Sequence, residues 1–367
     1  MTNWSMRSQA FALPLFVAYM AVLADWRIRW GEPGARPGHK LWLLPLLMVA
    51  WVNLHGSFVL GGVLICLVFA GELLAIVIGR RDAALGSLKP LVMWGAVTAV
   101  AVFLNPSGPA VFRYVLGLVS NPAVQGIVEE WQAPAAGTVV GNLFFAYAAL
   151  VAVAAVFARR RPDAVEVLAL ATFFWLALGG ERHVIWFALI SVPFLAKQAA
   201  SVAGAGEGAR QGRRGLNLAL LGTMALAVVL VLPPVKRHLS LPPALQGLVS
   251  ADTPVETVEF MRADERRPDR LFHTETTGSY LMWAAPEQKV FVDARVQLYP
   301  LRQVEDFRRL SAGIAADSLL AVYAIDGLLL DDERQASLLD WAAGSPDWDV
   351  RFKEACCTYL LRRSGSP

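Results

Sequence analysis

Eight apolar stretches separated by short polar connections fill the first 235 residues of this 367-residue chain. A helix that crosses the hydrocarbon core of a bilayer needs about 20 residues, because each residue adds about 1.5 Å along the axis. Four of the eight stretches are shorter than this and need a locally thin bilayer or flanking residues. We therefore expect an α-helical polytopic membrane bundle of about eight transmembrane helices, at 9–26, 41–54, 57–79, 91–104, 141–158, 164–179, 184–196 and 216–234.

Acidic residues divide the chain into two parts. Only 10 of the 30 Asp and Glu residues fall in the first 235 positions, and 20 fall in the last 132. The chain is 56% hydrophobic and 17% charged, whereas soluble domains are about 45–50% apolar and about 25% charged. These values exclude a single soluble domain, a disordered chain and a disulfide-rich secreted scaffold. They predict a transmembrane helical domain over 1–235, a linker over 236–249 and a small α/β domain over 250–367.

Lys and Arg residues predict the orientation of the bundle. Fourteen of them lie in the alternate connections and only two, Arg113 and Arg182, lie in the opposite ones. Because cytoplasmic loops carry an excess of Lys and Arg, the basic connections are expected in the cytoplasm. The protein is therefore predicted to lie in the cell membrane as a multi-pass protein, with its C-terminal domain extracytoplasmic.

The polar residues that we select as a candidate site all fall on the predicted outer side. Arg and His side chains bind phosphate, and a carboxylate can orient or deprotonate an acceptor hydroxyl. The loop over 105–140 also carries apolar residues at helical spacing over 111–119, which predicts a helix along the membrane interface. We predict Glu129 and Glu130 as catalytic carboxylates. The predicted substrate-binding residues of this side are Asn53, His55, Arg113, Arg182 and His183.

Each of these residues also has a structural explanation. The stretch 53–56 can cap a helix and turn the chain, and Glu129 and Glu130 can be solvated at a membrane surface. Glu181 and Arg182 can form a local ion pair at a helix end. The shared side of the membrane, more than any single residue, favours a site.

Several kinds of site are excluded by the sequence. It contains no Gly-rich phosphate loop, no Gly-x-Ser-x-Gly elbow and no Cys/His spacing that suits zinc, so no cofactor and no metal are predicted. The Gly/Arg-rich stretch 201–215 is interpreted as a basic loop that faces anionic membrane lipid, so nucleic acid is not a predicted partner. Cys356 and Cys357 are interpreted as buried strand residues, with oxidation possible in an extracytoplasmic compartment, because a disulfide between neighbours is strained and rare.

The last 115 residues alternate between strand and helix patterns, which predicts an α/β domain. Asp293, Arg295 and Tyr299 follow a predicted buried strand, and ligands of α/β sheets gather at the carboxyl ends of strands. We therefore predict these three residues as substrate-binding, with a mutual ion pair as the alternative. The expected helices are 254–262, 278–285, 301–311, 317–324 and 333–343, and the expected strands are 270–273, 289–294, 326–331, 348–354 and 357–363.

Taken in order, the motifs of this chain resemble a family of bacterial multi-pass membrane proteins of GT-C glycosyltransferase type. The resemblance covers nearly the whole chain, although each motif is short. It departs from the family at Thr276-Thr277 and at Ala294. The motifs are Trp51-x-Asn-x-His-Gly-Ser-Phe58, Leu104-Asn-Pro-x-Gly108, Glu130-Trp131, Arg182-His183, Arg270-Leu-Phe272, Gly278-Ser-Tyr-Leu-x-Trp283, Val290-Phe-Val-Asp-x-Arg295 and Tyr299.

The resemblance implies transfer of a sugar from a polyprenyl-phosphate-linked donor on the outer face of the membrane. It also implies a catalytic Asp or Glu in a first outer loop, and this sequence has no such loop. The stretch 5–9 is similar to a mid-protein stretch of the family, so we expect that the chain lacks the N-terminal catalytic part.

Two other classes of function are considered. The alternative to a glycosyltransferase or its fragment is a non-catalytic membrane-anchored scaffold, or a polysaccharide-assembly protein, with a periplasmic α/β binding domain. A transporter is less favoured, because it requires ionisable residues in mid-span and only Glu72 approaches that position, near a cytoplasmic end.

Overall fold

The structure is a computed structural model that describes residues 9–30, 38, 40–122, 124, 129–158, 160–202, 214–232, 235, 238 and 249–363. Two compact units make up the chain, Met1–Arg210 and Gln211–Pro367. The stretch 5–8, most of the predicted linker 236–249 and most of the basic loop 201–215 lie outside the described residues.

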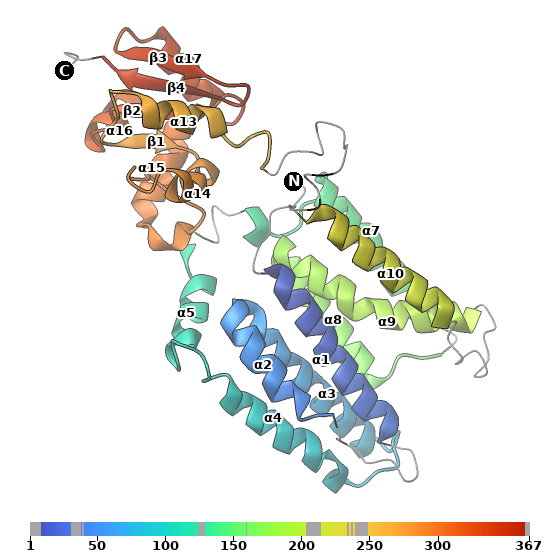
Figure 1. The fold of residues 1–367 in the computed structure, drawn as a ribbon. Coiled ribbons are helices and arrows are strands. Elements are labelled where there is room, and N and C mark those ends of the chain that lie inside the picture. The colour runs from blue at the N-terminus through green and yellow to red at the C-terminus, as the bar shows by residue number, and fades with distance from the viewer. Residues whose placement is uncertain are drawn as a thin grey trace. The chain divides into compact units, whose positions relative to one another are not determined.

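The described part of the first unit is helical, and a further helix opens the second unit (Figure 1). Each of the eight apolar stretches forms a helix, as predicted from the sequence, and the predicted helix over 111–119 is also present as α5. The elements are α1 (Gln9–Arg29), α2 (Leu43–Leu54), η1 (Gly56–Phe58), α3 (Val59–Val77), η2 (Leu85–Leu88), α4 (Lys89–Ala101), α5 (Ala110–Val119), η3 (Glu129–Trp131), α7 (Val139–Val156), α8 (Ala164–Gly179), η4 (Glu181–His183), α9 (Val184–Val202) and α10 (Arg214–Val231).

Four helical segments among the described residues are long and apolar enough to cross a membrane: Gln9–Arg29, Gly56–Val77, Val139–Val156 and Glu181–Val202. The helices α2, α4, α5 and α8 are apolar but shorter. Such a set of segments indicates a multi-pass membrane protein.

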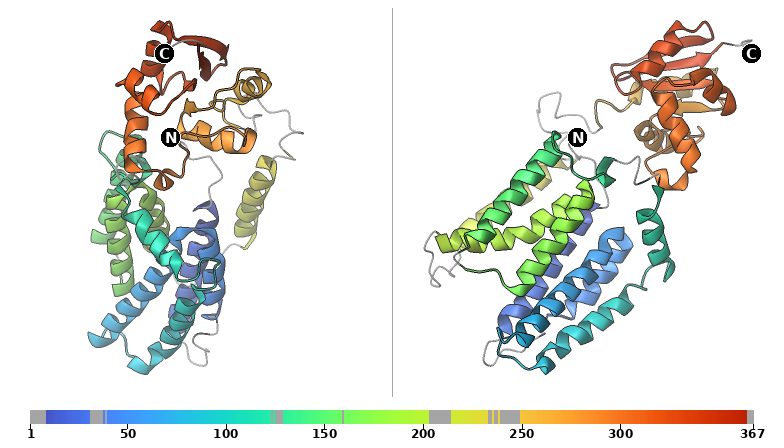
Figure 2. Two further views of the ribbon diagram at one scale, coloured as in Figure 1. Left: turned by 90° about the vertical axis from the view of Figure 1, so that its left-hand side faces the viewer. Right: turned by 180° about the vertical axis from the view of Figure 1, so that it is seen from behind.

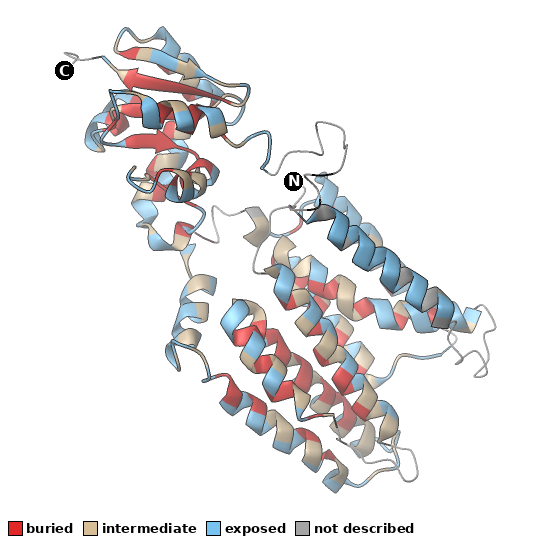
Figure 3. Cartoon of the chain, viewed as in Figure 1, coloured by how far each residue is buried: buried red, intermediate tan, exposed pale blue. Residues whose placement is uncertain are grey.

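An aromatic cluster holds the centre of the first unit together. Phe16 of α1 lies with its ring centroid 6.2 Å from Trp51 of α2, 5.5 Å from Phe173 of α8 and 5.0 Å from Trp186 of α9. All four side chains are buried, and the buried faces of α1, α2 and α3 form the red core of Figure 3. Since lipid is as apolar as these side chains, packing rather than exclusion of water holds the helices together.

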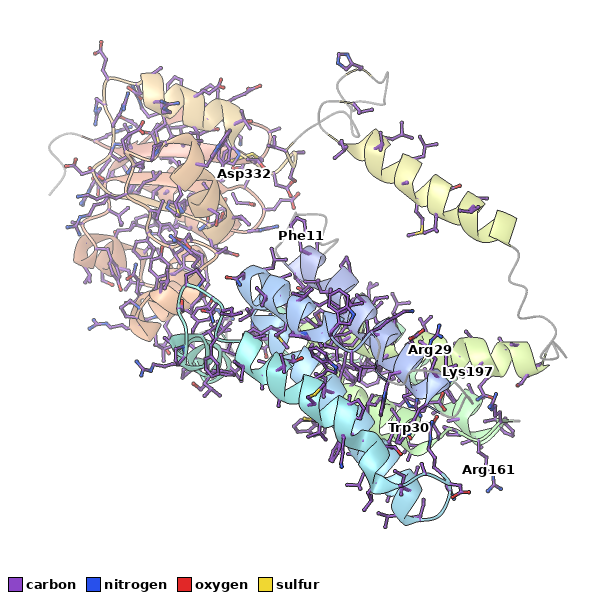
Figure 4. The ribbon with its side chains drawn as sticks, turned by 60° about the horizontal axis from the view of Figure 1, so that its bottom comes forward. Phe11, Arg29, Trp30, Arg161, Lys197 and Asp332 are labelled. Atoms are coloured by element: carbon purple, nitrogen blue, oxygen red, sulfur yellow. A yellow bond between two sulfur atoms is a disulfide. The ribbon has the colours of Figure 1, made fainter. Side chains whose placement is uncertain are left out.

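Basic side chains of the alternate connections lie at one end of the first unit. Arg29, Trp30, Arg161 and Lys197 lie together in Figure 4, whereas Phe11 lies near the other end of α1. At the basic end Lys197 forms an ion pair with Glu166, and the side chain of Gln198 donates to the carbonyl of Arg160 at 3.0 Å. The alternate connections that were grouped by charge in the sequence therefore share one end of the folded unit.

Helix α3 approaches the backbone of α8 closely at Gly71. A Cβ atom added to Gly71 would lie 2.7 Å from the Cα and 2.8 Å from the backbone nitrogen of Val165. Backbone atoms cannot retreat as a flexible side chain can, so we expect Gly71→Ala to destabilise the unit by about 1–3 kcal/mol, as overpacked cores do. The midpoint of thermal unfolding in detergent measures this effect.

Gly62→Ala in the same helix is the matched control, because an added Cβ there has no neighbour within 4 Å. Alanine is the better helix former by about 1 kcal/mol, so this variant should be neutral or slightly stabilised. Equal midpoints for the two variants would contradict the close contact of α3 and α8 at Gly71.

The second unit contains a mixed four-stranded sheet with the order β1-β2-β4-β3. Strands β1 and β2 are parallel, and the pairs β2–β4 and β3–β4 are antiparallel. The described elements that follow α10 are α13 (Val255–Ala263), β1 (Leu271–His273), α14 (Glu275–Ala284), η6 (Val296–Leu298), α15 (Leu301–Ser311), α16 (Ala316–Val322), β2 (Gly327–Asp331), α17 (Ala336–Gly344), β3 (Trp348–Lys353) and β4 (Cys357–Arg362).

Helices cover both faces of this sheet (Figure 2). Successive side chains of a strand point to opposite faces, so Leu328 packs with residues of α15, α16 and α17, and Leu329 packs with residues of α13 and α14. Each face therefore has a hydrophobic core of its own.

The predicted strand over 289–294 is wrong, because none of these residues lies in a strand or pairs with a described strand. Side chains satisfy its backbone instead. The N–H of Phe291 donates to Nε2 of His273 at 3.1 Å, Nε2 of Gln303 donates to the carbonyl of Phe291 at 2.7 Å, and the N–H of Ala294 donates to Oγ of Ser279 at 3.1 Å. The apolar residues of this segment, Phe291 and Val292, are buried as their pattern predicts, but burial does not require strand pairing.

The interpretation of the two adjacent cysteines needs a correction as well. Cys357 is a buried residue of β4, as expected, whereas Cys356 lies before β4 and is half-buried, and the two cysteines form a disulfide. The turn between β3 and β4 brings the two sulfur atoms together.

Candidate functional site

The candidate site begins at the turn between α2 and α3. The backbone of His55 is extended, and its Nδ1 accepts the N–H of Ser57 at 3.1 Å, which caps η1. Oγ of Ser57 lies 2.8 Å from the same nitrogen and accepts Nε1–H of Trp51 at 3.1 Å. Since Nδ1 of His55 accepts a backbone N–H, the proton of the neutral ring is on Nε2, which remains as a donor.

The short helices η3 and η4 pack against each other at this polar end of the first unit. The N–H of Glu181 donates to the carbonyl of Gln132 at 2.9 Å, which joins η4 to the residue after η3. The guanidinium of Arg182 lies over the ring of Trp131, 4.0 Å from its centroid. A cation held against an aromatic face keeps its charge in a fixed place, so Trp131 positions Arg182.

The charges of Arg182 and Glu130 act on the imidazole of His55. Burial lowers the pKa of His55 below its usual value, the positive charge of Arg182 lowers it further, and the carboxylate of Glu130 opposes both. The imidazole is therefore neutral near pH 7. The charges of Glu130 and Arg182 thus both act on His55 in the folded unit, and the catalytic and binding roles of these residues stay predictions.

The other residues predicted for this side have different surroundings. The side-chain amide of Asn53 donates to the carbonyls of Val49 and Leu104, at 2.8 and 2.9 Å, and so ties the end of α2 to the end of α4. Nδ1 of His183 is buried and has no hydrogen-bond partner among the described residues. The side chain of Glu129 lies outside the described residues, although its backbone forms part of η3.

Arg113 lies on α5 and is exposed. The same helix packs on η1 through Phe112, whose ring centroid is 6.0 Å from that of Phe58. Among the contacts that the described residues make, none joins Arg113 to His55 or to Arg182.

Asp293, Arg295 and Tyr299 form a closed cluster in the second unit. Oδ1 of Asp293 accepts Nε–H of Arg295 at 3.0 Å, and Oδ2 accepts Nη2–H of Arg295 and the hydroxyl of Tyr299, both at 2.7 Å. The bonds from Arg295 lower the pKa of Asp293 to about 2, although burial opposes them, and burial together with the Asp293 bond raises the pKa of Tyr299 to about 12. The alternative interpretation of a mutual ion pair describes this cluster.

Sequence reasoning missed the roles of Trp131, Trp51 and Ser57. Trp131 follows Glu130 directly, but its contact with Arg182 joins segments that are far apart in the sequence, and no local signal identifies it. The bonds of Ser57 depend on a turn geometry that the sequence does not reveal.

Comparison with known protein families finds no model that matches the chain, and comparison with curated proteins finds no match either.

Proposed function

We propose that this chain is a membrane glycosyltransferase of GT-C type, or part of one, which takes a sugar from a polyprenyl-phosphate donor at the outer face of the bilayer. The observation that carries the proposal is the grouping of His55, Glu130 and Arg182 at the polar end of a multi-pass helical unit. A guanidinium and an imidazole suit a phosphate, and a carboxylate suits a hydroxyl. The resemblance of the motifs adds the sugar and the lipid carrier.

The proposed topology has eight spans, α1, α2, α3, α4, α7, α8, α9 and α10, with the α/β part that follows α10 outside the cytoplasm. Three observations support it. The Lys and Arg residues favour one set of connections, the polar residues of the site lie in the opposite set, and the second unit contains the disulfide of Cys356 and Cys357. Disulfides persist in oxidising compartments such as the cell envelope.

In the proposed reaction a hydroxyl of the acceptor attacks the anomeric carbon of the donor sugar. The bond between this carbon and the phosphate oxygen breaks, and polyprenyl phosphate leaves with the bonding electrons. Glu130 takes the hydroxyl proton, with Glu129 as the other candidate carboxylate. Arg182 and Nε2–H of His55 stabilise the negative charge that develops on the phosphate.

Replacing Arg182 with Gln should weaken the binding of polyprenyl phosphate about 10- to 100-fold. A hydrogen bond to a charged group is worth about 1.5–3 kcal/mol, and each 1.4 kcal/mol is about tenfold in Kd. Arg182→Lys keeps the charge but loses the planar fork, so its Kd for polyprenyl phosphate should lie between those of the wild type and Arg182→Gln. Binding to the detergent-solubilised chain and transfer of radiolabelled sugar from polyprenyl-phosphate donors are the measurements.

Arg80→Gln at the basic end is the matched control, since Arg80 is exposed and the proposed site lies at the other end. This variant should change Kd by less than about twofold. The proposal fails if Arg182→Gln and Arg80→Gln bind polyprenyl phosphate equally well while both remain folded by their thermal midpoints.

A non-catalytic scaffold is the second candidate. The sheet of the C-terminal unit has a hydrophobic core on each face, and Asp293 forms its hydrogen bonds with Arg295 and Tyr299 of the same unit. These features are typical of a stable domain that could bind a partner. This candidate gains if no polyprenyl-phosphate donor binds the chain and the C-terminal unit still retains a cell-envelope partner.

A further inference from the structure

An apolar groove of about 380 Å³ lies between α3, η2 and the beginning of α4. Phe69 and Leu73 form its wall on α3, one helical turn apart, and Val92 and Met93 form its wall on α4. Leu88 closes the floor and is only 4% exposed, whereas Val92 and Met93 are 52% and 53% exposed. The groove therefore has a packed floor and an open side.

One positive charge stands at the rim of this groove. Lys89, the first residue of α4, is its only charged lining residue, and Leu85 is the apolar residue beside it. Among the described residues, no ion pair and no hydrogen bond is formed by the ammonium group of Lys89. In the same connection Arg81 forms an ion pair with Glu72. The remaining positive charges of this connection are Lys89 and the exposed Arg80, and its one negative charge is the exposed Asp82.

The position of the groove narrows the choice of occupant. Both of its walls belong to apolar helices of a multi-pass protein, so lipid is the medium expected at its open side. The lining residues form two levels along the helices. Lys89 and Leu73 belong to one level, and Met93 and Phe69 belong to the other, about one helical turn or 5.4 Å away. Its volume falls within the roughly 300–1,000 Å³ that is usual for ligand sites. A lipid with a phosphate at the level of Lys89 would place its acyl chain along both levels.

We propose that this groove binds one anionic phospholipid, with an acyl chain between α3 and α4 and the phosphate at Lys89. A zwitterionic lipid has the same chain but gains less from a single lysine, because its own ammonium group compensates the phosphate. The site is separate from the residues around His55, and the proposal does not depend on sugar transfer.

Photo-crosslinking with lipids tests the proposal on the full chain in nanodiscs. The probes are a phosphatidylglycerol and a phosphatidylcholine that carry the same diazirine-labelled acyl chain, and mass spectrometry locates the crosslinks. We expect phosphatidylglycerol to crosslink to the lining of α3 and α4 about fivefold more than phosphatidylcholine, the factor that about 1 kcal/mol per lysine gives. Lys89→Gln should bring this ratio close to one.

Two matched pairs of variants separate this site from general lipid contact. Leu73→Trp fills the groove and should abolish the groove crosslinks of both lipids, whereas Leu74→Trp on the exposed neighbour should leave them unchanged. Arg80→Gln removes an exposed charge of the same connection and should keep the ratio near five. An even spread of crosslinks over the lipid-facing helices, or equal ratios for Lys89→Gln and Arg80→Gln, would overturn the proposal.

Discussion

Replacing Glu72 with Gln is expected to lower the free energy of unfolding of the helical unit by about 3 kcal/mol. The side chain of Glu72 is 1% exposed, and its Oε1 accepts Nε–H of Arg27 at 2.6 Å. Its Oε2 accepts Nη1–H of Arg81 at 2.7 Å. Loss of the carboxylate leaves two guanidinium groups beside each other with no charge between them. We place the effect at the low end of the range for broken buried ion pairs, because both arginines are partly exposed.

The neighbours of these arginines make the loss hard to relieve by movement. Arg27 also donates to Oδ2 of Asp163 at 2.9 Å, and the guanidinium of Arg81 lies 4.4 Å from the ring centroid of Trp30. Arg81 in addition donates to the carbonyl of Arg27 at 3.0 Å. Glu72 therefore connects the ends of α1 and α3 with the start of α8.

Glu166→Gln is the matched control for this prediction. Glu166 forms the capping box of α8 with Asp163 and pairs with Lys197, whose side chain is more than half exposed. Gln can replace Glu in a capping box, and exposed ion pairs contribute about 0–1 kcal/mol, so this variant should lose less than about 1 kcal/mol. Equilibrium unfolding in mixed micelles compares the two. Equal losses would show that Glu72 is not the central residue of the basic end.

The same network shows what the sequence could and could not predict about the bundle. Each helix was predictable because a run of apolar residues is a local property, and each basic connection because charge is counted along the chain. Glu72 looked like an interfacial residue near the end of an apolar stretch. Its two partners lie 45 residues before it and 9 residues after it, and no local pattern joins them.

The candidate site shows the same division. The alternation of basic connections was enough to predict that His55, Glu130 and Arg182 share one end of the unit. The contact of Arg182 with Trp131 depends on how two loops fold against each other, and the sequence does not contain that geometry. Asp293 and Arg295 lie two positions apart, so their ion pair was foreseeable as an alternative, whereas the missing strand before them was not.

Acidification should destabilise the C-terminal unit, because His273 is buried and neutral. The residue is 0% exposed, Nδ1–H donates to the carbonyl of Thr274 at 2.8 Å, and Nε2 accepts the N–H of Phe291. Burial lowers its pKa from 6.5 to about 4, against the opposing effects of the Thr274 bond and the charge of Asp293. Between these two pH values the unfolded chain binds more protons than the folded one, so stability rises with pH.

This linkage gives a measurable difference in the pH range where few other groups of the unit titrate. With values of 6.5 in the unfolded and about 4 in the folded state, the unit should be about 2 kcal/mol less stable at pH 5.0 than at pH 7.5. The contribution of Asp293, whose pKa is lowered to about 2, is lost only below about pH 4 and does not overlap with this range. Hydrogen exchange of the β2 amides, corrected for the intrinsic rate at each pH, reports the opening free energy in the full chain.

A pair of histidine variants isolates His273 as the cause. His273→Gln cannot titrate and can still donate and accept, so it should be less stable at pH 7.5 but lose the pH dependence of the β2 opening energy. His238→Gln, which replaces an exposed histidine of the same unit, should keep the full dependence of about 2 kcal/mol. The prediction fails if the wild-type opening energy is the same at both pH values, or if His273→Gln retains the difference. In either case the buried imidazole, which accepts the Phe291 N–H in place of a neighbouring strand, is not the cause of acid sensitivity in this sheet.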